Sequence, residues 1–387
     1  MPDAVVIVVG GGASGLSAAA ALTRRRIEVV VLEQDATVGG TWARRYDRLR
    51  LHSVRGFSGL AHFPIPRRYP RYLSRNDMVA YLDEYARHFN VRVITGTTVD
   101  RIQPRRDPPP GWIIETAAGD RWHCRVVVVA TGQYREPIVP AWPGRETYGG
   151  RLTHSVAYAN AAPFVGQRVL VVGAGNSGAE IATDLSDHGA KSVALSVRTP
   201  PPIVPRDPFG MPVQRTSLLL SLLPVSIANR FARLTAKLTI GDLTRYGMPA
   251  PAEFAPYTTR RVPLIDVGFV DALKRRRITI KPALGRLTPT GAMFADGTGD
   301  TYDAIIAATG FETGLDSLIA APDLPALLDD HGEPRGLAGT PTAQPGLYFV
   351  GYIQSLRGHL FEANRASRRL ARYVERYLTR GTSSDGL

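Results

Sequence analysis

The stretch "VVIVVGGGASGLSAAAAL", residues 5–22, decides the fold class. An apolar run rich in valine leads into three glycines, and an alanine-rich run follows them. A second apolar run, "IEVVVLE" at residues 27–33, completes the order strand, turn, helix, strand. This order is typical of a βαβ unit, in which the two strands are parallel. The sequence therefore predicts an α/β protein.

The glycines of this turn fit the pattern GxGxxG, with Gly10, Gly12 and Gly15 at its fixed positions. The first glycine permits the tight turn, the second lets the backbone approach a pyrophosphate, and the third lets the helix pack on the strand. The phosphates then lie at the helix N-terminus, where unpaired N–H groups favour negative charge. Glu33 follows Gly10 by 23 residues, where a carboxylate can hydrogen-bond ribose hydroxyls. We predict that this unit binds an adenine dinucleotide.

The stretch "RVLVVGAGNSGAEIATDL", residues 168–185, repeats the pattern with Gly173, Gly175 and Gly178. Counting 23 residues from Gly173 reaches Ser196 rather than an acid, and Arg198 follows. A carboxylate there would repel a 2'-phosphate, whereas an arginine can hold one through two N–H groups. We therefore predict NADPH in the second unit and FAD in the first. The alternative for the arginine is a surface side chain that ends a strand.

The rest of the chain predicts how the two units are organised. Apolar runs at 124–132 and 301–310 both end in Ala-Thr-Gly, as though the chain leaves a sheet at each. A further short strand is expected at 346–351. The predicted fold is α/β with two Rossmann-like dinucleotide-binding domains, the NADPH domain being inserted into the FAD domain. The predicted boundaries are 1–155 and 283–387 for the FAD domain, and 156–282 for the NADPH domain with a helical cap near 215–245.

Composition narrows the possible partners. The formal charge of +13 comes mostly from arginines spread along the chain and interrupted by acids, which favours a solvated basic surface over a nucleic-acid site. The chain begins almost at once with an apolar strand rather than a basic leader, so we expect a cytoplasmic protein. Residues 215–240 are apolar and basic but too interrupted for a membrane span. We prefer a helical cap over a substrate tunnel there, with peripheral membrane contact as the alternative.

Cys124 is the only cysteine. A single thiol forms neither an internal disulfide nor a CxxC redox pair, and no Cys/His cluster has metal spacing. The sequence therefore predicts no metal site, and it excludes a disulfide reductase that needs two cysteines.

Two further motifs resemble those of a known family, the class B flavin-containing monooxygenases, and most of all the YUCCA-type branch with its bacterial relatives. "GGTWARRYDRLRLHS", residues 39–53, is similar to the family's Gly-Gly-x-Trp turn and its Tyr-Asp-x-Leu-x-Leu-His run. "YGGRLTHSVAY", residues 148–158, is similar to the family pattern FxGxxxHxxx, with Tyr148 in place of Phe. Tyr158 ends it where the related Baeyer–Villiger branch has Trp. The likeness covers nearly the whole chain.

The resemblance implies an FAD-dependent, NADPH-using monooxygenase. Family members form a C4a-(hydro)peroxyflavin and insert one oxygen of O2 into a small organic substrate, and the flavin supplies the reactivity. The reaction is expected to be a YUCCA-like oxidative decarboxylation of a 2-oxo acid, or N- or S-oxygenation. The expected partners are a small-molecule substrate and O2, without nucleic acid or a transmembrane segment, and a homodimer is one possible assembly.

The motifs and the resemblance together predict the site residues. No catalytic residue is certain, and His52 and His154 are the candidates, with a hydrogen-bonded structural histidine as the alternative for each. The residues predicted to bind the two cofactors are Gly10, Gly12, Ala13, Ser14, Gly15, Glu33, Gly40, Thr41, Trp42, His52, Thr131, Gly132, Gly173, Gly175, Asn176, Ser177, Gly178, Arg198, Thr309, Gly310 and Gly351.

Two other functions fit paired dinucleotide folds. An NADPH-dependent flavin reductase or oxidase of the quinone type would use both cofactors without transferring oxygen. A non-catalytic binding protein would keep the flavin fold and use its basic surface instead.

Overall fold

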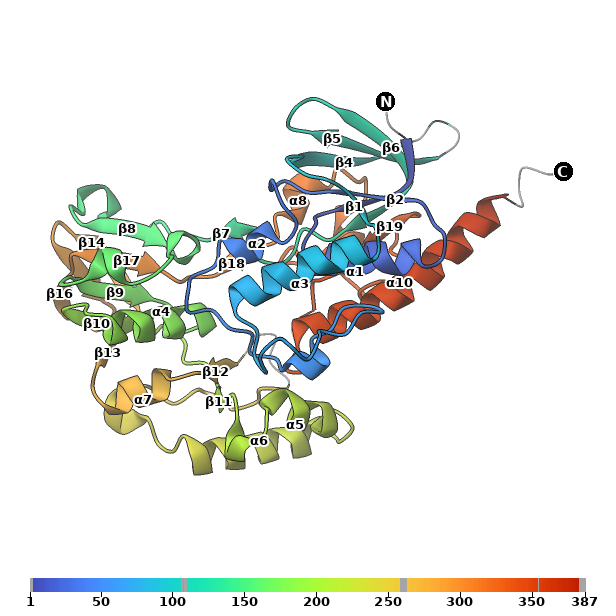
Figure 1. Ribbon diagram of the computed structural model, residues 1–387. Helices are drawn as coiled ribbons and strands as arrows, with labels where there is room; N and C mark the ends of the chain where they lie inside the picture. Colours follow the sequence, from blue (N-terminus) through green and yellow to red (C-terminus); the bar gives the residue numbers. More distant parts are fainter. Residues whose placement is uncertain (1–2, 106, 108–109, 258–262, 354, 383–387) are drawn as a thin grey trace.

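Two large sheets of unequal size, both containing parallel strands, organise the protein, and small sheets adjoin them (Figure 1). The computed structural model describes residues 3–105, 107, 110–257, 263–353 and 355–382. In Figure 1 the smaller sheet lies on the left and the larger one at the upper right. Helices α5 (Val213–Leu220) and α6 (Val225–Thr239) lie below them. The protein is a mixed α/β fold.

The larger sheet has seven strands in the order β3-β2-β1-β6-β5-β4, and β19 also pairs with β6. The pairs among β3, β2, β1, β6 and β19 are parallel, whereas β4 and β5 form an antiparallel extension. The strands are β1 (Asp3–Val9), β2 (Val29–Leu32), β3 (Arg92–Ile94), β4 (Val99–Arg105), β5 (Gly111–Thr116), β6 (Arg121–Val129) and β19 (Leu347–Phe349).

Helices cover this sheet because its central strands are apolar on both faces. Val6, Ile7 and Val8 of β1 are all fully buried, as a parallel strand between two layers requires. Helix α1 (Ala13–Thr23) packs against α10 (His359–Thr382) and α3 (Arg75–His88). The alanines of α1 allow the close approach of these neighbours.

The smaller sheet has five strands in the order β13-β10-β9-β17-β8, and every pair in it is parallel. Helix α4 (Asn176–Asp187) follows β9 and packs against α7 (Phe269–Lys274). Strands β8 and β17 lie outside the predicted 156–282 segment, because pairing between strands far apart in the chain adds them to the sheet. The strands are β8 (Arg151–His154), β9 (Arg168–Val172), β10 (Ser192–Ser196), β13 (Ile278–Lys281) and β17 (Ala304–Ala307).

Two small sheets extend the five-stranded one. An antiparallel sheet of three strands packs on it through Leu287 and Phe294, and β11 pairs with β12 in parallel near α6. The bounds are β11 (Ile203–Pro205), β12 (Leu264–Asp266), β14 (Leu284–Thr288), β15 (Gly291–Phe294) and β16 (Gly299–Thr301).

The chain passes between the two large sheets at a single place. Strand β7 (Glu136–Pro137) leads away from the seven-stranded sheet, and β18 (Phe311–Glu312) leads back. The two strands pair antiparallel, with Phe311 opposite Pro137. The apolar cores divide in the same way. Among the described residues, Tyr46 is the one buried residue from outside 138–310 in the core of the five-stranded sheet.

Candidate active site

The first glycine turn joins β1 to α1 at the carboxyl edge of the seven-stranded sheet. Gly10 has φ +106°, and a Cβ there would lie 2.6 Å from the carbonyl oxygen of Ala130. A Cβ at Gly15 would lie 1.8 Å from the carbonyl oxygen of Gly10. At Gly12, by contrast, a Cβ would meet no described atom within 4 Å. The turn is closed where the pattern requires close packing and open where a phosphate would approach.

The N-terminus of α1 faces this opening without a capping side chain. Gly12 is the N-cap residue in extended conformation, and no side chain of the described residues accepts from the first turn. Ala13 and Ser14 begin the helix, and both are buried. Their amides belong to the group that an α-helix leaves without internal partners, so the site favours an anion.

Glu33 follows β2 and is only 6% exposed. Its carboxylate accepts hydrogen bonds from the amide of Gly11 and, at 2.9 Å, from the amide of Asp35. Burial raises the pKa of Glu33, although these two backbone hydrogen bonds act in the opposite direction. The predicted ribose acid therefore lies directly against the first glycine turn.

Two segments from elsewhere in the chain close around this turn. The amide of Gly39 donates to the carbonyl of Gly11 at 3.2 Å, which places α2 (Gly40–Ala43) beside it. A Cβ at Gly351 would lie 2.5 Å from Oγ of Ser14. The structure thus brings Gly351 to the start of α1 and the predicted residues Gly40, Thr41 and Trp42, all within α2, to the adjoining turn.

Thr131 and Gly132 follow β6 on the same edge of the sheet. Oγ1 of Thr131 lies 2.8 Å from the hydroxyl oxygen of Tyr352. Burial raises the pKa of Tyr352 to about 12, so its hydroxyl stays neutral at physiological pH. Sequence reasoning missed Tyr352, because only its place after Gly351 in the chain signals a role.

The second glycine turn repeats the first between β9 and α4. Gly173 has φ +112°, and a Cβ there would lie 2.4 Å from the carbonyl oxygen of Ala308. A Cβ at Gly178 would lie 1.9 Å from the carbonyl oxygen of Gly173. Gly175 has no described atom within 4 Å of such a Cβ. Its φ and ψ of −77° and −178° match the values of −76° and −175° at Gly12.

The two turns differ where the first has its acid. The amide of Glu33 donates to the carbonyl of Ile94 at 2.9 Å, and the amide of Val197 donates to the carbonyl of Lys281 at the same distance. Val197 is therefore the structural equivalent of Glu33, one residue beyond the Ser196 that the spacing indicates. The second turn has no carboxylate at either position. Arg198 comes next and is exposed.

The two polar residues at the start of α4 are engaged with the protein. Asn176 accepts from the amide of Ile265 at 2.8 Å and donates to the carbonyl of Pro263 at 3.2 Å. Ser177 lies beside Tyr46, whose pKa burial raises well above its usual value. The start of α4 also presents backbone amides that no N-cap side chain occupies.

His52 contacts α4. Its Nε2 atom is 2.7 Å from Oε1 of Glu180, whose side chain is 4% exposed. The loop that carries Tyr46 and His52 thus contacts the first two turns of α4. Sequence reasoning missed Glu180, because its partner lies 128 residues away in the chain.

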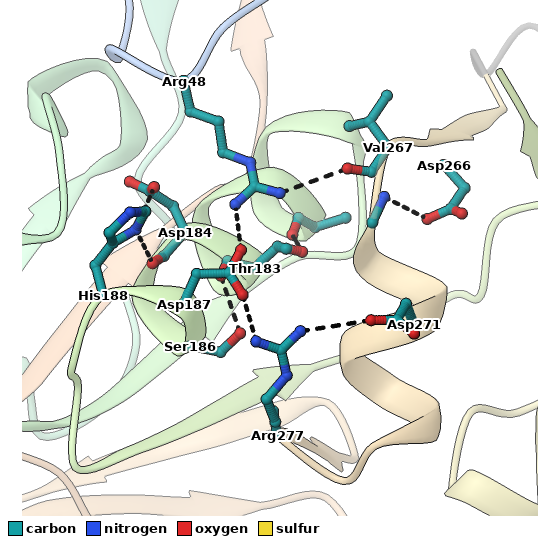
Figure 2. A network of polar contacts seen from close by, with 12 residues as sticks. Arg48, Thr183, Asp184, Ser186, Asp187, His188, Asp266, Val267, Asp271 and Arg277 are labelled. Atoms are coloured by element: carbon teal, nitrogen blue, oxygen red, sulfur yellow. Dashed lines mark hydrogen bonds and ion pairs between the residues drawn. The ribbon is translucent and has the colours of Figure 1, made fainter.

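The same loop contacts the C-terminal end of α4 through Arg48 (Figure 2). Nη1 of Arg48 lies 2.6 Å from Oδ2 of Asp187, the last residue of the helix, and Arg277 pairs with the other carboxylate oxygen. Burial alone would raise the pKa of Asp187, but the hydrogen bonds from the two arginines lower it. Cations at a helix C-terminus also complement its dipole.

His154 ends β8 with both ring nitrogens bonded to backbone. Its Nδ1 accepts from the amide of Val156 and its Nε2 donates to the carbonyl of Gly310, both at 3.1 Å. Burial lowers the pKa of His154. The hydroxyl of Thr309 donates to the carbonyl of Ile138. These contacts place His154, Thr309 and Gly310 next to the crossing between the sheets.

Comparison with known proteins agrees with this geometry. Residues 7–204 match the model of the pyridine nucleotide-disulphide oxidoreductase family. The chain is 36% identical over 343 residues to the indole-3-pyruvate monooxygenase YUCCA1 of Oryza sativa subsp. japonica, which covers 85% of this chain and 81% of the relative. It is 33% identical to the probable indole-3-pyruvate monooxygenase YUCCA1 of Arabidopsis thaliana, over 87% of this chain and 81% of the relative.

The chain belongs to the flavin-containing monooxygenases of the YUCCA type. Among solved structures, this monooxygenase is similar to the flavin-containing monooxygenase from Stenotrophomonas maltophilia, with 26% identity and a TM-score of 0.72. The match covers 98% of this chain and 100% of that one. It shares its fold with a steroid monooxygenase bound to NADP, with a TM-score of 0.77 at 19% identity. That match covers 98% of this chain and 87% of the other.

Monooxygenases of this family use FAD and NADPH, and so does this one. The residues present fit two such groups. The space beside Gly12 and Gly175 is open, and a Cβ there would occupy it. Both helices also begin without a capping side chain among the described residues. The named relatives favour oxygen transfer over a reductase. None of the described helices is long and apolar enough to cross a membrane.

Proposed function

We propose that this monooxygenase has two Rossmann-like domains, with FAD on the seven-stranded sheet and NADPH on the five-stranded one. The observation that carries this assignment is the difference between two otherwise equivalent turns. The first has the buried carboxylate of Glu33, and the second has Val197 followed by the exposed Arg198. A carboxylate pairs with free ribose hydroxyls, whereas a guanidinium pairs with a 2'-phosphate.

The NADPH domain in this proposal is the inserted one, and its ends lie at β7 and β18. These ends replace the boundaries near 155 and 283, because β8, β14, β15, β16 and β17 all join the five-stranded sheet or its core. Residues 1–137 and 311–387 then form the FAD domain. The partition of the apolar cores supports this division.

On the FAD side, the residues predicted to bind the cofactor serve different parts of it. The open backbone at Gly12 and the first amides of α1 receive the pyrophosphate. Glu33 receives the ribose hydroxyls. The adjoining segments, which come from α2, from the end of β6 and from Gly351, surround the turn and exclude water from it. Tyr352 holds Thr131 in position by the hydrogen bond between their hydroxyls.

On the NADPH side, the open backbone at Gly175 and the first amides of α4 receive the other pyrophosphate. The side chain of Asn176 fixes the segment at 263–265 beside the turn. Arg198 donates to the 2'-phosphate. The contact of His52 with Glu180 then fixes α4 relative to the FAD domain.

The chemistry requires little acid–base work from side chains. When bound, FAD accepts a hydride from NADPH and activates O2, so that one oxygen atom enters the substrate and the other leaves as water. The protein binds and orients the two cofactors and keeps water away. The backbone hydrogen bonds at both nitrogens of His154 leave it no free nitrogen for proton transfer, so we assign it a structural role.

The proposed substrate class is a 2-oxo acid, which the enzyme decarboxylates oxidatively. The names of the plant relatives state that they act on indole-3-pyruvate, which is such an acid. The balanced reaction consumes one NADPH, one proton and one O2 per substrate, and it releases NADP+, CO2, water and the shortened carboxylate. A cytoplasmic location and a homodimeric state stay predictions from the sequence.

The test begins with the purified protein in oxidised form. A yellow preparation whose absorbance bleaches with NADPH under anaerobic conditions supports the cofactor assignment, and a colourless one that retains no added FAD contradicts it. A panel of 2-oxo acids, thioethers and amines is then tested for NADPH consumption, CO2 release and H2O2. A 2-oxo acid that releases one CO2 per NADPH without H2O2 supports the substrate class. Consumption that ends only in H2O2 with every compound points to an oxidase.

A further inference from the structure

Exposed apolar side chains gather on the hairpin of α5 and α6 and on the residues just before it. Among the described residues, fourteen large apolar side chains are exposed, and ten of them lie between 209 and 238. Leu222, at the turn between α5 and α6, is 82% exposed. Scattered exposed apolar residues are ordinary, whereas a group of this size marks an interaction surface. The ten are Phe209, Met211, Leu219, Leu222, Leu223, Val225, Ile227, Phe231, Leu234 and Leu238.

Helix α6 turns its large apolar residues outward. Ile227, Phe231, Leu234 and Leu238 follow one another at spacings of four, three and four residues, so they share one face of the helix. All four are at least 47% exposed. The buried residues of α6 are two alanines, Ala228 and Ala236. The helix therefore packs on the protein through its small residues and presents its apolar row to the outside.

A row of cations runs beside this apolar row. Arg230, Arg233 and Lys237 are exposed, and their spacings of three and four residues place them on one face of α6, next to the apolar row. The sequence has no Asp or Glu between Pro208 and Gly241. The outer surface of the hairpin is thus apolar and cationic, without an acid of its own.

The hairpin is held in place by the protein beneath it. The side chain of Gln214 in α5 is buried, accepts from the amide of Val54 at 2.8 Å and donates to the carbonyl of Arg357 at 2.5 Å. Oγ of Ser217 lies 3.0 Å from the hydroxyl of Tyr257. These contacts fix α5 on the protein, and α6 packs beside it through Ala228 and Ala236 with its apolar row exposed.

We propose that the α5–α6 hairpin docks this enzyme on the surface of an anionic lipid bilayer. A helix of this composition lies in the interface, with its apolar row among the headgroups and its cations against lipid phosphates. Charge complementarity selects this partner, because the hairpin carries only cations and the whole chain has a formal charge of +13. A second copy of the chain that docked through the same hairpin would bring the same cations and no acid to pair with them.

The experiment is cosedimentation of the full-length holoenzyme with lipid vesicles. One set of vesicles is phosphatidylcholine alone, and the other mixes phosphatidylcholine with phosphatidylglycerol. The enzyme is expected to pellet with the mixed vesicles, to stay in solution with phosphatidylcholine alone, and to be released by salt. A protein with tryptophan placed at the hairpin tip, Leu222→Trp, is expected to show a blue shift of emission with the mixed vesicles only.

Matched variants test whether the apolar row and the cationic row of α6, rather than other parts of the surface, are responsible for vesicle binding. Phe231→Ser with Leu234→Ser removes apolar area, and Arg230→Gln with Arg233→Gln removes two cations. Each cation near an anionic surface changes binding about fivefold, so the second pair is expected to weaken binding about twentyfold or more. The controls are Val165→Ser with Leu337→Ser, which are exposed apolar residues elsewhere, and Arg145→Gln with Arg286→Gln, which are exposed arginines elsewhere. All variants are checked for FAD content and NADPH oxidation without vesicles.

Each outcome decides the proposal. Loss of binding in both hairpin pairs, with intact controls and FAD content, supports it. Binding to neither set of vesicles overturns it, and so does an equal loss in the controls. A dimer in solution that Phe231→Ser with Leu234→Ser converts to monomer, without any vesicle binding by the parent protein, assigns the surface to a second copy instead.

Discussion

Nε2 of His52 lies 2.7 Å from Oε1 of Glu180, and this contact joins the loop after α2 to the helix that follows the second glycine turn. Glu180 is 4% exposed on its side chain, so its charge or hydrogen-bonding capacity needs a partner. Tyr46 from the same loop also lies near Glu180, whose charge helps to raise the pKa of Tyr46 after burial, the main cause. The contact between His52 and Glu180 therefore connects the two parts of the protein beside the proposed NADPH site. It is separate from the connection at β7 and β18.

Removal of this contact is expected to destabilise the protein. His52→Leu leaves the buried Glu180 with one partner fewer, which lowers the free energy of unfolding by about 1–3 kcal/mol. Adding Glu180→Gln is expected to recover part of the loss, because a neutral amide is less costly to bury. Denaturant titration of the two single variants and the double variant measures the coupling. The exposed His331→Leu serves as control, and strictly additive effects would show that the two side chains act independently.

Arg198→Ala is expected to weaken the binding of NADPH more than that of NADH. A charge-assisted hydrogen bond contributes about 1.5–3 kcal/mol, which corresponds to a rise of about tenfold to a hundredfold in the KM for NADPH relative to NADH. Steady-state kinetics with both nucleotides measures this ratio, and the exposed Arg286→Ala provides a control without effect. Equal changes for NADPH and NADH would remove Arg198 from the 2'-phosphate role.

The middle glycines of the two turns allow the cofactor sites to be separated. A Cβ meets no described atom within 4 Å at Gly12 or Gly175, so alanine at either is expected to fold and to obstruct only a bound pyrophosphate. Gly12→Ala should lose FAD, measured by the flavin absorbance per protein. Gly175→Ala should keep FAD and raise the KM for NADPH.

Gly15→Ala is the matched control for this pair. Its Cβ would lie 1.8 Å from the carbonyl oxygen of Gly10, so this variant is expected to fold poorly or not at all. Loss of FAD in Gly175→Ala, with FAD retained in Gly12→Ala, would instead assign FAD to the second glycine turn and NADPH to the first.

His154 predicts a pH dependence of stability. Burial lowers the pKa of its ring in the folded protein, so the unfolded chain binds the proton more readily. The corresponding stability is present above the unfolded pKa of about 6.5 and is lost as the pH falls below that value, towards the lower folded pKa. In His154→Gln the melting temperature should fall less steeply over this window. Parallel curves for the parent and the variant would show that another group is responsible.

Local patterns in the sequence predicted much of the fold and of the site. The roles of Gly10 and Gly15 follow from a strand–turn–helix order within a few residues, and the structure shows the close contacts that the pattern requires. The spacing rule was less accurate at the second turn, where Val197 rather than Ser196 takes the place of Glu33. A fixed spacing fails there because the distance along the chain depends on the lengths of the helix and the loop.

Contacts between distant segments could not be predicted in this way. The addition of β8 and β17 to the five-stranded sheet depends on pairing between residues more than 100 positions apart, such as Arg151 and Ala304. The partners of His52 and Thr131 are likewise remote in the chain. Sequence patterns describe what a segment can do by itself, whereas these contacts depend on how the whole chain folds.

The pairing of β7 with β18 has a consequence for the history of such a chain. Pro137 and Phe311 lie opposite each other although residues 138–310 separate them. The two ends of this whole segment therefore join the rest of the fold at the same point. A gene that gained or lost the segment would leave three of the apolar cores intact and would open only a small gap. An ancestor with the proposed FAD domain alone would then differ from this enzyme by one insertion rather than by a rebuilt fold.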